Sequence, residues 1–112
     1  MNLIYLTLLY CMTSFYVKAC SPDGYFQLTL CRNSYFNNCE VIETHTGCCY
    51  SMPAPYVTSL NSAKAWLDTC TFYTGANCDG AGQCIDTEGY RDMSRLPAYR
   101  SYFCRNGGAS HC

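Results

Sequence analysis

The sequence has few of the groups on which enzymes and metalloproteins depend. It contains two histidines, His45 and His111, and only 13% of its 112 residues are charged. No two cysteines have the C-x-x-C spacing of zinc sites, and adjacent Cys48 and Cys49 make a poor chelating pair. Phosphate-binding loops, dinucleotide fingerprints and Gly-x-Ser-x-Gly nucleophile motifs are also missing. We therefore expect no metal site, no cofactor and no catalytic activity.

Long hydrophobic runs are absent except at the N-terminus. Residues 3–12 are mostly apolar but too few to cross a bilayer comfortably. They lead to Val17-Lys18-Ala19, which places apolar or small residues at positions −3 and −1 of a cut before Cys20. This pattern predicts a secretory signal peptide over residues 1–19. A buried N-terminal element and a lipid-attached Cys20 are the alternatives, and a lysine at position 18 fits a lipid-attachment box poorly.

Positive charge is scarce in the chain that would remain after cleavage. Seven Lys and Arg less Lys18 leave six against eight Asp and Glu, a net charge of −2. The chain has no basic stripe and no cationic amphipathic helix, so we expect it to bind neither nucleic acid nor membranes after cleavage. It also lacks an Asn-x-Ser/Thr sequon, so N-glycosylation is not expected.

Cysteine, by contrast, is abundant. Removal of residues 1–19 also removes Cys11, which turns an odd count of 11 into ten. The ten are Cys20, Cys31, Cys39, Cys48, Cys49, Cys70, Cys78, Cys84, Cys104 and Cys112. That density is typical of a disulfide scaffold, which a small secreted chain needs because its core buries little surface. We therefore expect a secreted, extracellular protein with all ten cysteines paired, in a pattern that the sequence leaves open.

Alternation of apolar and polar residues is common, and helical periodicity is scarce. Strands are predicted at Tyr25–Cys31, Cys39–Thr44, Cys70–Tyr73 and Tyr102–Cys104. Two prolines make Ser51–Pro55 a predicted loop, and Asn61–Leu67 is the one segment expected to be helical or a mixed turn. Short strands between frequent turns predict an all-β fold, a small disulfide-rich β-sandwich over residues 20–106. A tail, 107–112, would be tied down by Cys112.

The chain contains two related halves of about forty residues, the size of a four-strand Greek key. An offset of 39 residues pairs Cys31 with Cys70, Cys39 with Cys78 and Ser62 with Ser101. An offset of 42 pairs Leu28 with Cys70, Leu30 with Phe72, Asn38 with Gly80 and Ile42 with Cys84. We prefer 42 for the first hairpin. The difference indicates a three-residue insertion in the first half, near the double-proline loop.

These halves resemble the Greek-key motifs of the βγ-crystallin superfamily, above all its small, secreted, cysteine-rich microbial members, many of them fungal. The first resemblance lies in Leu30–Asn38, Gly47–Tyr56 and Asn61–Lys64, and the second in Phe72–Gly80 and Ser101–Cys104. Together they cover most of residues 25–104. The resemblance implies a sandwich of two Greek keys, with motif 1 at about 25–66 and motif 2 at about 69–105.

The resemblance also implies roles for individual residues. Asn38 and Gly80 match the hairpin position that takes a left-handed backbone conformation, which glycine adopts freely and asparagine next best. Ser62 and Ser101 match the serine whose hydroxyl ties the folded hairpin to a later strand. The disulfides expected from the fold are Cys39–Cys49, Cys70–Cys104 and Cys20–Cys112.

Some superfamily members bind calcium through an Asn/Asp-Asn/Asp-x-x-Ser/Thr-Ser segment. The matching stretches here, Val57–Ser62 and Leu96–Ser101, lack both acidic or amide residues at their start. Calcium binds through several oxygen ligands, usually with carboxylates among them. We therefore expect no calcium site.

The expected function is that of a non-enzymatic interaction protein outside the cell, such as a microbial effector or toxin-like factor. Its partner would be an extracellular protein or glycan, and eight tyrosines after residue 19 would suit such a surface unless strand faces bury them. One alternative is a protease inhibitor or antimicrobial protein with rigid loops. The other is a small secreted ribonuclease, which would use Glu43, His45, Arg91, Arg95, Arg100 and His111. The ribonuclease is disfavoured because one histidine adjoins a turn and the other lies in a glycine-rich tail.

Overall fold

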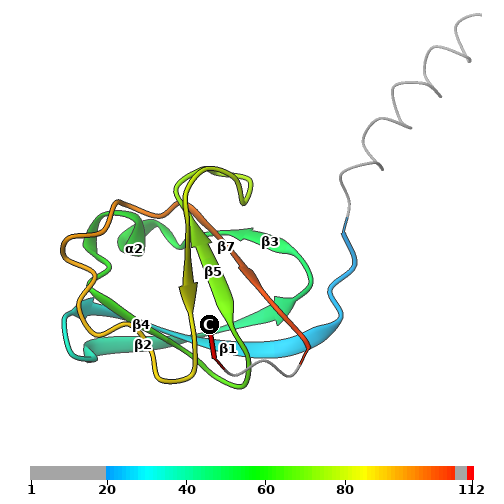
Figure 1. The fold of residues 1–112 in the computed structure, drawn as a ribbon, viewed down its shortest axis with the longest axis horizontal. Helices are drawn as coiled ribbons and strands as arrows, with labels where there is room; N and C mark the ends of the chain where they lie inside the picture. Colours follow the sequence, from blue (N-terminus) through cyan, green and yellow to red (C-terminus); the bar gives the residue numbers. More distant parts are fainter. Residues whose placement is uncertain (1–19, 108–110) are drawn as a thin grey trace, which may run out of the picture.

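A computed structural model describes residues 20–107 and 111–112 of the chain, so the signal peptide expected at 1–19 lies outside the described residues. In this part the elements are β1 (Gly24–Asn33), β2 (Asn37–Thr46), β3 (Cys49–Ser51), α2 (Ala54–Ser59), β4 (Ser62–Ala65), β5 (Cys70–Tyr73), β6 (Gly82–Ile85) and β7 (Ser101–Cys104) (Figure 1). None of the helices in the described ranges is long and apolar enough to cross a membrane.

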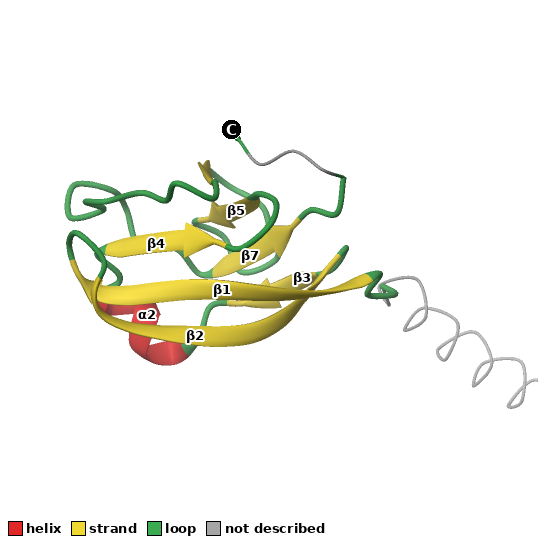
Figure 2. Ribbon diagram, turned by 90° about the horizontal axis from the view of Figure 1, so that it is seen from below, coloured by secondary structure: helices red, strands yellow, loops and turns green. Residues whose placement is uncertain are grey.

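The strands form two antiparallel sheets, which Figure 2 shows stacked on each other. One sheet has the order β2-β1-β4, and the other has the order β3-β7-β5-β6. Strand β3 of the first half pairs with β7 of the second half. In the opposite direction, Tyr90 of the second half forms an isolated bridge to Ala63 at the edge of β4. Each half thus contributes to the other's sheet, and the predicted all-β sandwich of two Greek keys is confirmed.

The core follows from the period-2 alternation of the strands. In β1, Phe26, Leu28 and Leu30 are buried, and the residues between them face the other side of the sheet. The second sheet meets these side chains with Phe72, Ile85 and Tyr102, among others. Every buried side-chain nitrogen or oxygen among the described residues has a hydrogen-bond partner. The residues of β1 that alternate with the core side chains, and most residues of β2, are not buried and form the outer face of this sheet.

Two local predictions are wrong. The segment Asn61–Leu67, expected to be helical or a mixed turn, contains strand β4, in which Ala63 and Ala65 alternate into the core. The only described helix, α2, begins instead within the predicted loop, because a proline is tolerated in the first turn of a helix. Its Tyr56 is buried against the core, and that burial stabilises a helix of only six residues.

Ten cysteines form five disulfides, Cys20–Cys48, Cys31–Cys39, Cys49–Cys78, Cys70–Cys104 and Cys84–Cys112. The expected Cys70–Cys104 bond is present, whereas the expected bonds Cys39–Cys49 and Cys20–Cys112 are wrong. Cys39 lies directly opposite Cys31 in the β1–β2 register, so its nearest thiol is on the neighbouring strand. Cys20, the first described residue, is bonded to the β2–β3 turn, and Cys112 is bonded to β6.

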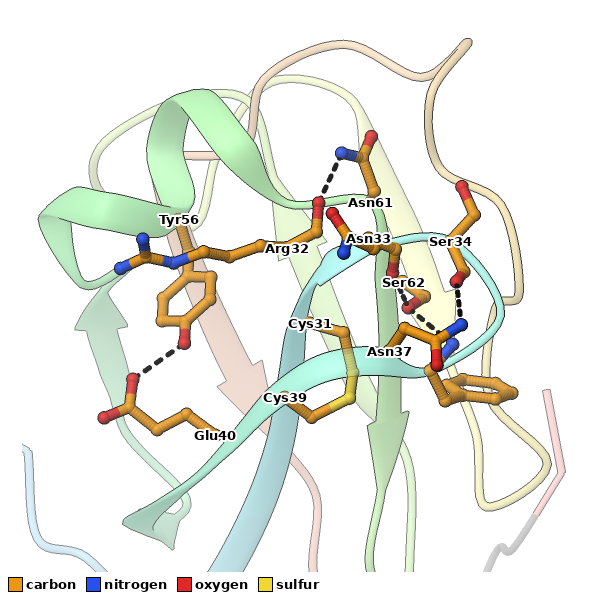
Figure 3. Close-up of a disulfide and its surroundings, with 11 residues drawn as sticks. Cys31, Arg32, Asn33, Ser34, Asn37, Cys39, Glu40, Tyr56, Asn61 and Ser62 are labelled. Atoms are coloured by element: carbon orange, nitrogen blue, oxygen red, sulfur yellow. Dashed lines mark hydrogen bonds between the residues drawn. A yellow bond between two sulfur atoms is a disulfide. The ribbon is translucent and has the colours of Figure 1, made fainter.

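The hairpin of the first half folds over onto Ser62, whose side chain is fully buried. The hydroxyl of Ser62 accepts a hydrogen bond from the Phe36 N–H (3.1 Å) and donates one to the Asn33 carbonyl (2.6 Å; Figure 3). Phe36 and Asn38 have φ angles of 60° and 57°. The left-handed backbone at Asn38 is the conformation that the resemblance implies for this position.

The second half repeats this arrangement. The hydroxyl of Ser101 accepts a hydrogen bond from the Cys78 N–H (2.8 Å) and donates one to the Gly75 carbonyl (2.5 Å). Cys78 and Gly80 have φ angles of 55° and 81°. A Cβ at Gly80 would lie 2.5 Å from the hydroxyl of Thr74, so both the backbone angle and the space favour glycine there.

The two registers found in the sequence describe different parts of this repeat. Hairpin positions correspond at an offset of 42, as Phe36 does to Cys78, whereas the tying serines correspond at 39. The hairpin residue that donates its N–H and the serine that accepts it are 26 residues apart in the first half and 23 residues apart in the second. The three extra residues therefore lie between the first hairpin and Ser62.

Candidate functional site: an exposed aromatic face

Five large apolar side chains of the described residues remain exposed. They are Tyr25 (47%), Tyr35 (67%), Val41 (55%), Trp66 (43%) and Leu67 (62%). Three of them, Tyr25, Trp66 and Leu67, lie near the end of the first sheet at which β1 begins and β2 ends. Tyr35 lies at the tip of the hairpin, at the opposite end of the same strands.

The strands position an aromatic cluster on the outer surface of this sheet. Tyr25 faces outward because Phe26 faces the core, and the β1–β2 register sets it opposite His45. Trp66 directly follows Ala65, which points inward, so the indole emerges on the outer side. We call Tyr25, His45 and Trp66 the aromatic face.

In the aromatic face, the Tyr25 ring stands nearly at right angles to the rings of Trp66 and His45. The Tyr25 ring centre lies 5.8 Å from that of Trp66 with an interplanar angle of 81°, and 6.4 Å from that of His45 with an angle of 86°. Trp66 also makes an edge contact with buried Phe26, with 6.4 Å between the ring centres. Such edge-to-face contacts are favourable, and the rings form a corner rather than one flat platform.

Polar side chains border the same rings. The Tyr25 hydroxyl donates a hydrogen bond to Glu43 Oε1 (3.0 Å) and accepts one from Gln27 Nε2 (3.0 Å). Gln27 and Glu43 are directly opposite each other on β1 and β2. An amide and a carboxylate each have more hydrogen-bonding positions than these two bonds use, so they can also serve a ligand.

A depression of about 230 Å³ adjoins the aromatic face. It is lined by Gly24, Tyr25, Phe26, Thr46, Leu67, Asp68, Arg105 and Asn106. The buried carboxylate of Asp68 accepts hydrogen bonds from the N–H groups of Thr69 and Gly107, both at 2.7 Å, and so holds the wall together. Arg105 and Asn106 are exposed and bring a cation and an amide to the rim.

The structure does not assemble the residues of the ribonuclease hypothesis. Glu43 and His45 share the outer face of β2 near its end. The backbone carbonyl of Arg91 accepts a hydrogen bond from Tyr35 at the hairpin tip, where β2 begins. Glu43 and His45 follow the start of β2 by six and eight residues, which separates them from that end by about 20–26 Å at ~3.3 Å per residue. His111 adjoins Cys112, which is bonded to Cys84 of β6.

A second hollow lies between the two segments that match the calcium-binding pattern. It measures about 290 Å³, and Val57, Leu60, Met93 and Leu96 are among its walls. Beside it, the Tyr56 hydroxyl donates to Glu40 (2.7 Å), and Arg32 lies 5.9 Å from the centre of the Tyr56 ring (Figure 3). Burial is the main reason that the pKa of Tyr56 is raised, and the hydrogen bond to Glu40 is the second. Within residues 20–107 and 111–112, no group of three or more His, Cys, Asp or Glu could hold a metal ion.

Sequence reasoning identified tyrosine as the candidate contact residue but overlooked Trp66. Of the eight tyrosines, Tyr56, Tyr99 and Tyr102 are buried, and only Tyr25 and Tyr35 are largely exposed. The available signal was the alternation Ala63-Lys64-Ala65-Trp66, which sets the tryptophan on the polar side of a strand. Because a helix or mixed turn was expected at Asn61–Leu67, this alternation was not read as a strand.

No protein-family model matches the chain, and no curated protein is significantly similar to it in sequence. Among solved structures, the chain is similar to the fifth crystall domain of the non-lens protein Absent in melanoma 1, determined in solution. The TM-score is 0.59 with 15% sequence identity, over 83% of this chain and 100% of that domain. At this identity the likeness shows the fold, so the chain has a βγ-crystallin-like, disulfide-rich β-sandwich.

Proposed function

We propose that the protein is a secreted, non-enzymatic binding protein that attaches to a target outside the cell through its aromatic face. The observation that carries the proposal is a tryptophan and a tyrosine that are both nearly half exposed and in contact on one face. Burying such rings in the core would be favourable, and exposed clusters of them commonly mark binding sites. A microbial effector or toxin-like role is the concrete form of this proposal, by analogy with the superfamily members that the sequence resembles.

Secretion is supported by the cysteines. All ten cysteines of the described residues are paired, and disulfides form and persist in oxidising compartments such as the extracellular space. The predicted signal peptide would deliver the chain to that environment. Absence of catalysis is supported by the separation of Glu43 and His45 from Arg91, which a ribonuclease would need to bring together.

The test uses the full chain expressed with its own N-terminus and recovered from the culture medium. Its intact mass should correspond to a chain that begins at Cys20 and lacks ten hydrogens, and reduction should restore them. A lipid on Cys20, or failure to reach the medium, would contradict secretion.

The binding part of the proposal is tested on intact cells and isolated cell-wall material of fungal, bacterial and plant origin. The wild-type protein should be retained on at least one of these surfaces. Trp66→Ala and Tyr25→Ala should reduce retention at least tenfold, whereas Tyr35→Ala, which removes an even more exposed tyrosine at the far end of the sheet, should not. Equal retention of all four proteins, or retention of none, would overturn the proposal.

A further inference from the structure

We propose that the ligand of the aromatic face is a neutral oligosaccharide of β-linked, glucose-type units. This inference rests on the proposed function, because it names the class of target that the same site would bind.

The exposed apolar area is too small for a folded protein partner. Tyr25, Trp66 and Leu67 are 47%, 43% and 62% exposed. For side chains of about 150–250 Å² this amounts to roughly 300 Å² of apolar surface. A stable protein interface buries about 800 Å² per partner, of which roughly 57%, or about 450 Å², is apolar. A ligand a few sugar units long needs no more apolar surface than this, and the adjoining depression of about 230 Å³ gives it a second region of contact.

The corner formed by the rings matches the amphipathic shape of a sugar. A glucose-type ring with equatorial substituents presents axial C–H groups on its two faces and hydroxyls around its rim. One C–H face can pack on an aromatic ring, and the perpendicular ring, 5.8 Å away centre to centre, then contacts the rim of the same sugar. A lipid chain would bury the apolar rings but would not satisfy the hydrogen-bonding positions of Gln27 and Glu43 that the Tyr25 hydroxyl leaves unused.

The polar groups match the hydroxyls of such a sugar. Glu43 offers carboxylate acceptors, and Gln27 offers both a donor and an acceptor, at a site where Tyr25 already fixes their positions. Neighbouring hydroxyls donate and accept in the same way. Arg105 and Asn106 would contact the next unit at the depression. Because the acidic Glu43 lies beside the rings and the cationic Arg105 on the rim, the site has no single-sign field for a polyanion, which favours a neutral chain.

The experiment uses Trp66 as its own probe, because the chain contains one tryptophan. The secreted, disulfide-bonded protein is titrated with cellohexaose, laminarihexaose and chitohexaose, and with α-linked maltohexaose as control. At least one β-linked hexamer should change the emission of Trp66 saturably and bind at least tenfold more tightly than maltohexaose. Calorimetry then follows the variants, including those that lack the indole.

Among the variants, Tyr25→Ala and Trp66→Ala should each weaken binding at least tenfold, and Glu43→Gln should weaken it several-fold. Tyr25→Phe keeps the ring and should lose less than Tyr25→Ala. Tyr35→Ala should bind as the wild type does. Thermal melting of each variant verifies folding, and Tyr25→Phe and Glu43→Gln keep the test decisive where an alanine variant is unstable.

Binding of a β-linked hexamer that Tyr25→Ala and Trp66→Ala leave unchanged would overturn the inference, because the sugar would then bind elsewhere. If none of the hexamers binds but retention on a cell surface still requires Trp66 and is abolished by treating that surface with protease, the target is a protein. The inference then fails while the proposed function stands. If neither retention nor sugar binding is found, both fail.

Discussion

The two serines that hold the folded hairpins allow a quantitative test of the repeat. Ser62 and Ser101 are fully buried, and each hydroxyl bridges one N–H and one carbonyl of its own hairpin. Replacing either serine by alanine leaves both backbone groups without that partner. Because the two sites are built alike, the two variants should lose similar amounts of stability.

The expected loss follows from the cost of an unsatisfied backbone group. Each buried donor or acceptor left without a partner costs about 1–3 kcal/mol. The serines are fully buried, but the hairpin groups to which they bond are only partly buried, so we expect a loss of about 2–4 kcal/mol of unfolding free energy per variant. The hairpins cannot move away to find water easily. The first is held by the bond from Tyr35 N–H to the Arg91 carbonyl (2.7 Å), and the second by the Cys49–Cys78 disulfide.

The assay is thermal and guanidinium unfolding with the disulfides intact. A loss of 2–4 kcal/mol corresponds to a decrease in Tm of about 10–20 °C for a domain of this size. Ser51→Ala is the matched control, because Ser51 lies opposite Ser101 in the β3–β7 ladder but is exposed, and it should stay within about 0.5 kcal/mol of wild type. If Ser62→Ala and Ser101→Ala behave like this control, the hydroxyls do not hold the hairpins.

Three further predictions concern backbone strain and ionisation. Gly89→Ala should lower the free energy of unfolding by at least about 2 kcal/mol, because φ at Gly89 is +85° and the new Cβ would lie 2.8 Å from the Ala63 carbonyl oxygen. Gly107→Ala is the control, because a Cβ there would have no atom within 4 Å. Equal melting temperatures of the two variants would contradict the clash. Tyr35→Gly should stabilise the protein by about 0.5–1 kcal/mol, because φ is 59° and the side chain is exposed; a guanidinium midpoint no higher than that of Tyr35→Ala would refute it. Burial raises the pKa of Tyr56, Tyr99 and Tyr102, so their contribution to stability is complete below about pH 10, the ordinary tyrosine pKa, and is lost as the pH rises through their folded-state values. Melting temperatures should therefore fall above that pH, and less so in Tyr56→Phe; tyrosinate absorbance showing every tyrosine ionised at about pH 10 would contradict this.

The sandwich and its hairpins could be predicted because local geometry restricts residue type. A strand with one buried face must alternate, as β1 does, and a left-handed residue is favourably Gly or Asn, as at Gly80 and Asn38. The offset of 42 was visible for the same reason. The helix α2 and the strand β4 were missed because their short segments gain their conformation from core contacts of Tyr56 and Ala63 rather than from propensity.

The disulfide pairing could not be derived, because it depends on which strands become neighbours. Cys31 and Cys39 are eight residues apart, and so are Cys70 and Cys78, yet only the first pair is bonded. Cys39 lies in register opposite Cys31, whereas Cys78 lies in the folded hairpin at positive φ and bonds to Cys49 of the other half. Equal spacing in the sequence therefore does not mean equal pairing, even within a repeat.

The disulfides also bear on the binding site. The segment that carries Trp66 and Leu67 runs directly into Cys70, which is buried and bonded to Cys104, the residue before Arg105. The turn after His45 is tied through Cys48 to the N-terminal segment that precedes Tyr25. Two disulfides, Cys20–Cys48 and Cys70–Cys104, thus anchor the segments on either side of the aromatic face and its depression. A ligand that binds there does not have to order the rings first, so even a small contact area can give useful affinity, because less conformational entropy is lost on binding.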